Sequence, residues 1–153
     1  MIEQESSCGN CCTCCTTLSI KADDGFYKDK PAGETCEYVA NNQCSIHEDR
    51  FSLCRKYECF WLQLAKKVDG GFPVIWRPDN LGIIITPKPE LEKDNKIPLY
   101  LKEVYKGAND LSRPELKSFL DTIVRLSRKQ KKEWEMYLIP FDSEGYGRKL
   151  IVN

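Results

Sequence analysis

The second half of the chain has the hydrophobic and polar pattern of short strands separated by turns. The segments 72–77 (FPVIWR) and 81–86 (LGIIIT) flank the turn-forming segment 78–80 (PDN), so we predict a β-hairpin there. Three later segments are also predicted as strands: 97–107 (IPLYLKEVYKG), 133–141 (EWEMYLIPF) and 148–153 (RKLIVN). The sheet that these strands form is expected to be small and antiparallel.

Three segments have the apolar spacing or the start signals of helices. The segment 112–115 (SRPE) has the S-x-x-E form of a capping box, which predicts that a long helix follows. The apolar residues on one side of that helix are Leu116, Phe119, Leu120, Ile123 and Leu126. The segment 45–48 (SIHE) repeats the pattern, so a helix is expected to run from there past Cys54 and to break near Tyr57. The segment 60–68 is predicted as a short helix with an apolar stripe of Phe60, Trp61, Leu64 and Val68.

Together these elements predict an α+β fold, with an irregular cysteine-rich module followed by a small antiparallel sheet with one long helix. We predict the boundary between residues 1–69 and 70–153 and expect the two parts to pack as one compact unit. A chain of 153 residues is long enough to bury a hydrophobic core. Stability alone therefore does not require cross-linking.

Charge and composition exclude several kinds of partner. The 23 basic and 23 acidic residues balance to a formal net charge of zero, so no global field draws the chain to nucleic acid or to an anionic membrane. The first ten residues lack the basic and apolar parts of a secretory signal, and no apolar run is long enough to span a bilayer. We therefore expect a cytoplasmic protein.

Motifs of common enzyme classes are absent from the sequence. There is no glycine-rich phosphate loop, no serine-centred elbow and no paired-histidine motif. His47 is the single histidine, so acid–base catalysis has one candidate without a visible partner. A non-catalytic protein is expected.

All nine cysteines lie within the first 59 residues. They are Cys8, Cys11, Cys12, Cys14, Cys15, Cys36, Cys44, Cys54 and Cys59. The odd number, the missing secretory signal and the two adjacent pairs argue against a framework of disulfides. In a reducing compartment, such a cluster typically holds metal.

The spacing of the first cysteines is typical of thiolate ligands. Two residues separate Cys8 from Cys11 and Cys11 from Cys14, and this interval lets two thiolates turn toward one ion. Cys14 and Cys15 are neighbours whose side chains are expected to diverge, so one of them serves a second ion or bridges two. Four more sulfurs arrive from farther along the chain: Cys36, Cys44, Cys54 and Cys59. Two four-sulfur sites can then form, and Cys12 is left over.

This cysteine pattern resembles that of a known family. The segments 8–15 (CGNCCTCC), 29–36 (DKPAGETC) and 41–63 (NNQCSIHEDRFSLCRKYECFWLQ) are similar to the YkgJ-like family, whose eight-cysteine CxxCxxCC domain is described as zinc- or iron-chelating. The segment 77–85 (RPDNLGIII) is similar to one that follows in some members. The resemblance implies metal binding by Cys8, Cys11, Cys14, Cys15, Cys36, Cys44, Cys54 and Cys59.

The chain departs from the family pattern at two positions. His47 stands where the family has tyrosine, and Phe51 stands where it has proline. A residue that replaces tyrosine is expected to pack or to form a hydrogen bond, so His47 is left out of the ligand set. Phe51 frees the backbone without touching any sulfur.

The charge of the cluster requires compensation. Eight thiolates carry eight negative charges, and two zinc ions return only four positive ones. Cations interleaved with the cysteines can offset the rest: Lys21, Lys28, Lys30, Arg50, Arg55 and Lys56. Zinc prefers closed four-thiolate sites, and the run that ends at Cys15 lacks the x3-Cys-Pro continuation of a bacterial ferredoxin. We therefore expect zinc, with iron or an iron–sulfur cluster as the alternative.

Two functions are compatible with this ligand set. The first is a non-catalytic protein that binds about two zinc ions in a structural or metal-handling role, with metal ions and another protein as its partners. The second is an iron or iron–sulfur redox protein that assists another enzyme. A zinc enzyme needs an open position for water, against which an even set of sulfurs argues. If the ions are structural, chelation is expected to unfold residues 8–63.

Overall fold

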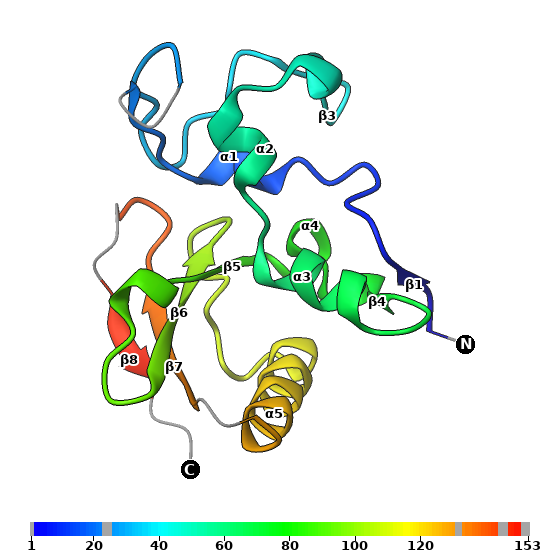
Figure 1. The fold of residues 1–153 in the computed structure, drawn as a ribbon, viewed down its shortest axis with the longest axis vertical. Coiled ribbons are helices and arrows are strands. Elements are labelled where there is room, and N and C mark those ends of the chain that lie inside the picture. Colours follow the sequence, from blue (N-terminus) through cyan, green and yellow to red (C-terminus); the bar gives the residue numbers. More distant parts are fainter. Residues whose placement is uncertain (1, 23–25, 131–132, 144–146, 151–153) are drawn as a thin grey trace.

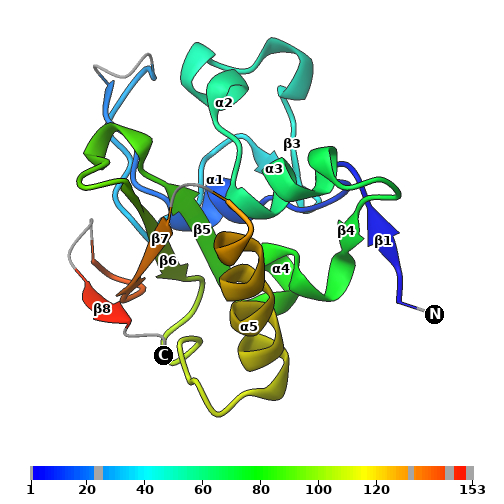
Figure 2. The ribbon, with the colours of Figure 1, turned by 60° about the horizontal axis from the view of Figure 1, so that its bottom comes forward.

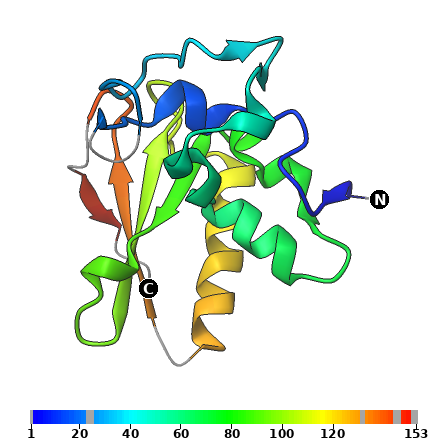
Figure 3. The ribbon, with the colours of Figure 1, turned by 45° about the horizontal axis from the view of Figure 1, so that its top comes forward.

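The computed structural model describes residues 2–22, 26–130, 133–143 and 147–150. Helices α3 (Phe60–Lys67), α4 (Pro78–Leu81) and α5 (Pro114–Arg128) lie on one side of a four-stranded sheet (Figure 1). The short helix α1 (Thr13–Thr17) and the cysteine-rich loops lie over one end of that sheet (Figures 1 and 3). The fold is thus α+β, as predicted, with the irregular segment first and the sheet after it.

The sheet has the strand order β5-β6-β7-β8. Its strands are β5 (Ile83–Pro87), β6 (Lys96–Glu103), β7 (Glu133–Ile139) and β8 (Arg148–Leu150). The outer pairs are antiparallel, but β6 and β7 are parallel, so the prediction of a wholly antiparallel sheet is wrong at this pair. Helix α5 is the cause, because it follows β6 and returns the chain to the starting end of the sheet before β7 begins (Figure 2).

The hairpin predicted over 72–77 and 81–86 is wrong. Strand β4 (Phe72–Pro73) pairs instead with β1 (Gln4–Glu5), near the start of the chain, and β5 pairs with β6. The two predicted strands therefore belong to different sheets.

Helix α4 occupies the place of the predicted turn. A single 3-10 turn over Val74–Trp76 precedes it. Pro78 starts the helix, and Gly82 ends it with a φ of 79°, in the left-handed conformation that terminates helices. Proline and aspartate start turns and helices alike, so the local sequence did not distinguish the two.

Neither capping box forms. Arg113 is the N-cap of α5, with an extended ψ of 121°, because a residue before proline disfavours helical backbone. Ser112 instead donates its hydroxyl to Asp110 Oδ1 at 2.7 Å. In the other segment, a 3-10 turn over His47–Asp49 is separated from α2 (Ser52–Lys56) by extended residues.

Other helix predictions are confirmed. Helix α2 ends at Lys56, so the break expected near Tyr57 is present. Helix α3 buries Phe60, Trp61 and Leu64 as predicted, but Val68 is its C-cap and is 42% exposed. Helix α5 buries most of its predicted stripe.

The two faces of the sheet have different roles. One face contributes to the hydrophobic core through Ile83, Ile85, Leu99, Leu101, Met136 and Leu138. The helices pack against that face with Phe60, Trp61, Leu64, Leu116, Phe119 and Ile123. The alternate residues point to the other face, which carries Ile84, Thr86, Tyr100, Lys102 and Ile139. This second face lines the cavity described below.

Residues on both sides of position 69 share the hydrophobic core, and β1 pairs with β4 across it. The domain boundary and the packing of the two parts as one unit stay predictions. Within the described ranges, no helix is long and apolar enough to cross a membrane.

Candidate metal centre

All nine cysteines line one cavity of about 740 Å³. They come from the loop before α1, from α1 itself, from one later loop, from strand β3 (Gln43–Cys44), from α2 and from the start of α3. The second face of the sheet closes the cavity on the side opposite to the cysteine loops. Chain segments that are up to 51 positions apart, from Cys8 to Cys59, therefore meet at one place.

A tight turn holds the first two cysteines. The amide of Cys11 donates to the carbonyl oxygen of Cys8 at 3.0 Å, and the amide of Cys15 donates to that of Cys12 at 2.9 Å. Cys14 and Cys15 then follow on α1, with their Sγ atoms 4.0 Å apart. We expected these side chains to diverge, and this distance is instead close to the spacing of about 3.8 Å between two sulfurs on one tetrahedral zinc ion.

Later segments bring the remaining cysteines to the cavity. The amide of Cys36 donates to the carbonyl oxygen of Cys15 at 2.8 Å, which joins this loop to α1. Cys44 lies on β3 (Gln43–Cys44), which forms a small hairpin with β2 (Val39–Ala40). Asn41 and Asn42 form its two-residue turn with φ values of 50° and 57°, a conformation that asparagine tolerates well.

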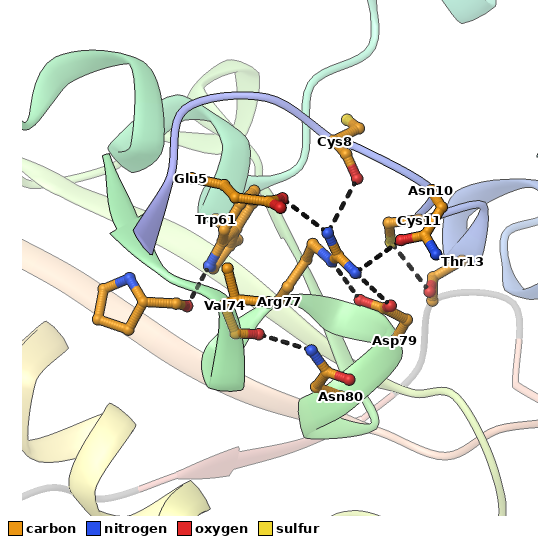
Figure 4. A network of polar contacts seen from close by, with 11 residues as sticks. Glu5, Cys8, Asn10, Cys11, Thr13, Trp61, Val74, Arg77, Asp79 and Asn80 are labelled. Carbon is orange, nitrogen blue, oxygen red and sulfur yellow. Dashed lines mark hydrogen bonds and ion pairs between the residues drawn. The ribbon is translucent and has the colours of Figure 1, made fainter. Parts of the chain in front are cut away.

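Arg77 connects the cysteine turn to α4 (Figure 4). Its buried guanidinium donates from Nη1 to Glu5 Oε2 at 2.8 Å and to the carbonyl oxygen of Cys8 at 3.4 Å. Nη2 donates to Asn10 Oδ1 at 2.9 Å, and Nε and Nη2 together hold both carboxylate oxygens of Asp79. This fork fixes the loop that carries Cys8 without using any sulfur.

The sequence pattern did not indicate this role of Arg77, and it predicted Asp79 as a turn residue. The one signal was their position in the segment 77–85, which resembles a family segment. A side chain that binds both a carboxylate and a distant loop is not visible as a pattern, because its partners lie 67 to 72 positions away.

Burial controls the protonation of several thiols. Burial raises the pKa of Cys8, Cys11 and Cys54, and it raises the pKa of Cys59 to about 12. A hydrogen bond with Cys14, followed by burial, raises the pKa of Cys15 strongly. Without an ion these thiols are protonated at neutral pH, so a metal has to displace their protons to bind.

Cations lie around the cavity, but only some of those predicted are close. Arg50 lines it and donates to the carbonyl oxygen of His47 at 2.8 Å. Lys30 is buried and donates to the carbonyl oxygen of Glu34 at 2.6 Å, and burial lowers its pKa against the opposing charges of Cys36 and Cys15. Of the predicted cations only Arg50 lines the cavity; Lys21, Lys28, Lys30, Arg55 and Lys56 are not among the lining residues. The structure adds Lys88 and Lys102 from the sheet side.

The two positions that depart from the family pattern also border the cavity. His47 is largely exposed, and its Nδ1 atom lies 3.5 Å from Glu48 Oε1, in agreement with the expected hydrogen-bonding role. Phe51 packs in a cluster with the rings of Phe26, Tyr27 and Tyr38. Phe26, Tyr38 and Phe51 of this aromatic cluster line the cavity.

The donor set suits a thiophilic metal, because thiolates are soft ligands that favour zinc, copper(I) and iron–sulfur clusters. Among the residues that the structure describes, however, no three side chains of histidine, cysteine, aspartate or glutamate lie close enough together to hold an ion. The sulfurs surround one space without converging on a point. Binding would therefore draw the cysteine loops inward.

Fold and site together define a class of protein, an α+β domain whose sheet carries a cavity lined by thiols. No family model, no curated protein and no solved structure matches the chain. Support for a function therefore comes from the site itself.

Proposed function

We propose that this chain is a non-catalytic metal-binding protein that holds about two zinc ions through eight cysteines. These are Cys8, Cys11, Cys14, Cys15, Cys36, Cys44, Cys54 and Cys59. The observation that carries the proposal is that all nine cysteines, from segments far apart in the sequence, line the same cavity. Cysteines that served only as small apolar residues would have no reason to gather in one place.

The state of the thiols supports metal over disulfides. All nine cysteines are free, and the sulfurs of Cys14 and Cys15, at 4.0 Å, are too far apart for a covalent bond. This agrees with a reducing compartment, so we keep a cytoplasmic location in the proposal. We also propose kinship with the YkgJ-like family, on the cysteine order and the segment 77–85.

An iron–sulfur cluster is the second candidate, and one observation favours it. The cavity volume of about 740 Å³ exceeds what two bare ions need, and a cluster brings its own sulfides to fill space. In that case the chain would carry electrons or assist another enzyme. Zinc remains the first choice because the ferredoxin continuation is missing.

Elemental analysis with an absorption spectrum, on protein purified without oxygen, tests the proposal. About two zinc ions per chain and no visible absorption are expected. Iron with inorganic sulfide and a visible charge-transfer band would replace zinc with the cluster. Protein that contains no metal, and that binds none when reduced and supplied with zinc or iron, would overturn both.

A further inference from the structure

Cys8 differs from the other cysteines in its exposure. It is exposed, whereas the other eight are half-buried. The residues on both sides of it, Ser6, Ser7, Gly9 and Asn10, are exposed as well, so this part of the chain lies at the surface. Cys8 also lines the cavity together with the other thiols. It therefore lies at the rim of the cavity, where both the cavity and solvent can reach it.

The backbone of Cys8 is fixed although the residue is exposed. Arg77 Nη1 donates to the carbonyl oxygen of Cys8 at 3.4 Å, and Nη2 donates to Asn10 Oδ1 at 2.9 Å. The same carbonyl oxygen accepts a hydrogen bond from the amide of Cys11 at 3.0 Å. The sulfur of Cys8 lies on the side of the chain away from Arg77 (Figure 4). It can therefore turn about its own Cα–Cβ bond while the turn that carries it stays in place.

The surface beside Cys8 gives room for an approaching molecule. An open groove of about 520 Å³ begins at Ser6 and Ser7 and extends to Lys66 and Asp69, near the end of α3. These polar side chains can form hydrogen bonds with a peptide that lies in the groove. A molecule in the groove is next to Cys8 without having to enter the cavity.

Exposure decides which thiolate ligand an incoming thiol can displace. When one thiolate replaces another on zinc, the number and the kind of ligands stay the same, so access of the incoming sulfur limits the exchange. The other proposed ligands are half-buried in the cavity. Cys8 is therefore the ligand that an external thiol reaches first.

We propose that Cys8 is the exchange ligand of the metal centre and that the chain passes the zinc ion bound there to a partner protein that presents cysteine thiols. This inference rests on the proposed function and makes that ion a cargo. In the exchange, a thiol of the partner protein loses its proton and its sulfur bonds to zinc. The bond between zinc and Cys8 Sγ breaks, and Cys8 takes up the proton. No electron is transferred, so zinc stays divalent.

Pulse alkylation of the zinc-loaded full chain tests which cysteine leaves first. The probe acceptor is a reduced, metal-free zinc-finger peptide with four cysteines, added in large excess. The Cys12→Ser variant is the background, because Cys12 lies outside the proposed ligand set. Brief iodoacetamide treatment at successive times, followed by peptide mapping, is expected to label Cys8 before any other cysteine. The label on Cys8 should increase with acceptor concentration, while folding of the acceptor reports the zinc that it receives.

The same acceptor peptide with its four cysteines replaced by serine is the matched control, and it is expected to free no cysteine and to take up no zinc. First labelling of another ligand, even labelling of all eight, or equal labelling of Cys8 with the serine peptide would overturn the exchange role. Zinc that stays on the chain in the presence of the thiol acceptor would also overturn it and would leave the proposed function intact. A chain that binds no zinc at all would refute the proposed function itself.

Discussion

Arg77 is a buried cation that holds three segments together. Its guanidinium contacts a carboxylate of β1, a carboxylate of α4 and the turn that carries Cys8. Only 7% of its side chain is exposed, whereas Glu5 and Asp79 are each about one third exposed. Solvent therefore partly screens the attraction between Arg77 and the two carboxylates. The buried guanidinium itself, however, cannot replace these partners with water.

Replacing Arg77 with methionine is expected to reduce the free energy of unfolding by about 2 kcal/mol, because two carboxylates and a carbonyl oxygen lose their donor. Urea denaturation of the metal-loaded protein measures this change. Arg128→Met, at an exposed position at the end of α5, is the control and should change stability by less than about 0.5 kcal/mol. Equal effects of the two variants would contradict the role of Arg77.

Protonation of the thiols predicts how metal affinity depends on pH. The pKa of Cys59 is raised to about 12 from an ordinary value of 9.0, so the metal-free thiol is protonated at neutral pH and the metal-bound sulfur is not. The metal-free state thus binds more protons, and zinc affinity must rise with pH. Competition with a chromophoric chelator between about pH 6.5 and 8.5 is expected to show about four protons released per ion.

Cys59→Ser should lower this proton release by about one at its own site, because serine does not ionise. Cys12→Ser should leave it unchanged. Zinc affinity that is constant or that falls as the pH rises would show that thiols are not the ligands.

At the scale of elements, the pairing of β1 with β4 brings the start of the chain beside the glycine turn after α3. Gly71 has a φ of 88°, and a Cβ atom there would lie 2.4 Å from the carbonyl oxygen of Glu5. Gly107 has nearly the same φ, 89°, but a Cβ atom there would meet nothing within 4 Å. A comparison of alanine substitutions at the two glycines therefore separates the cost of the left-handed backbone from the cost of a steric clash with β1.

Gly107→Ala is expected to cost about 1 kcal/mol, from the left-handed backbone alone. Gly71→Ala should cost about 1–3 kcal/mol more, because β1 has to move away. Thermal or urea unfolding of both variants checks the difference. If the two costs are equal, β1 does not pack against Gly71 as the structure indicates.

At the same scale, some elements could be predicted and others could not. The apolar stripes identify α3 and α5, and alternation identifies β6 and β7, because each pattern reports burial of one face. Alternation does not predict that β6 and β7 pair in parallel, since this depends on how α5, which lies between them in the chain, crosses back along the sheet. Segment 72–86 was mispredicted because its two apolar runs pair with β1 and β6, which no local pattern indicates.

For the molecule as a whole, the hydrophobic core and the cysteine cavity use different parts of the chain. Every residue of the main hydrophobic core lies at position 60 or later. Between Cys8 and Cys59, the described apolar side chains other than cysteine include one buried residue, Phe26. The cysteine segment therefore has little apolar burial of its own to stabilise it.

Metal removal is accordingly expected to unfold the cysteine segment and to leave the rest folded. Hydrogen exchange measured with and without a chelator should show loss of protection over residues 8–58 and little change in α5. The sequence predicted unfolding up to residue 63, but α3 packs in the core from Phe60 onward, so the limit moves to its start. Unchanged exchange over 8–58 would mean that the ions are not structural.

The sequence by itself determined the fold class, the two amphipathic helices and the presence of a thiol cluster, because these depend on residue type and local spacing. Tertiary structure alone decided that the middle strands run parallel, that the second face of the sheet meets the cysteines and that Arg77 holds the turn of Cys8. It also decided which cysteines are neighbours. Cys36 lies beside Cys15, and Cys59 lines the same cavity as Cys8, because the chain topology brings these segments together, and spacing along the sequence carries no information about such contacts.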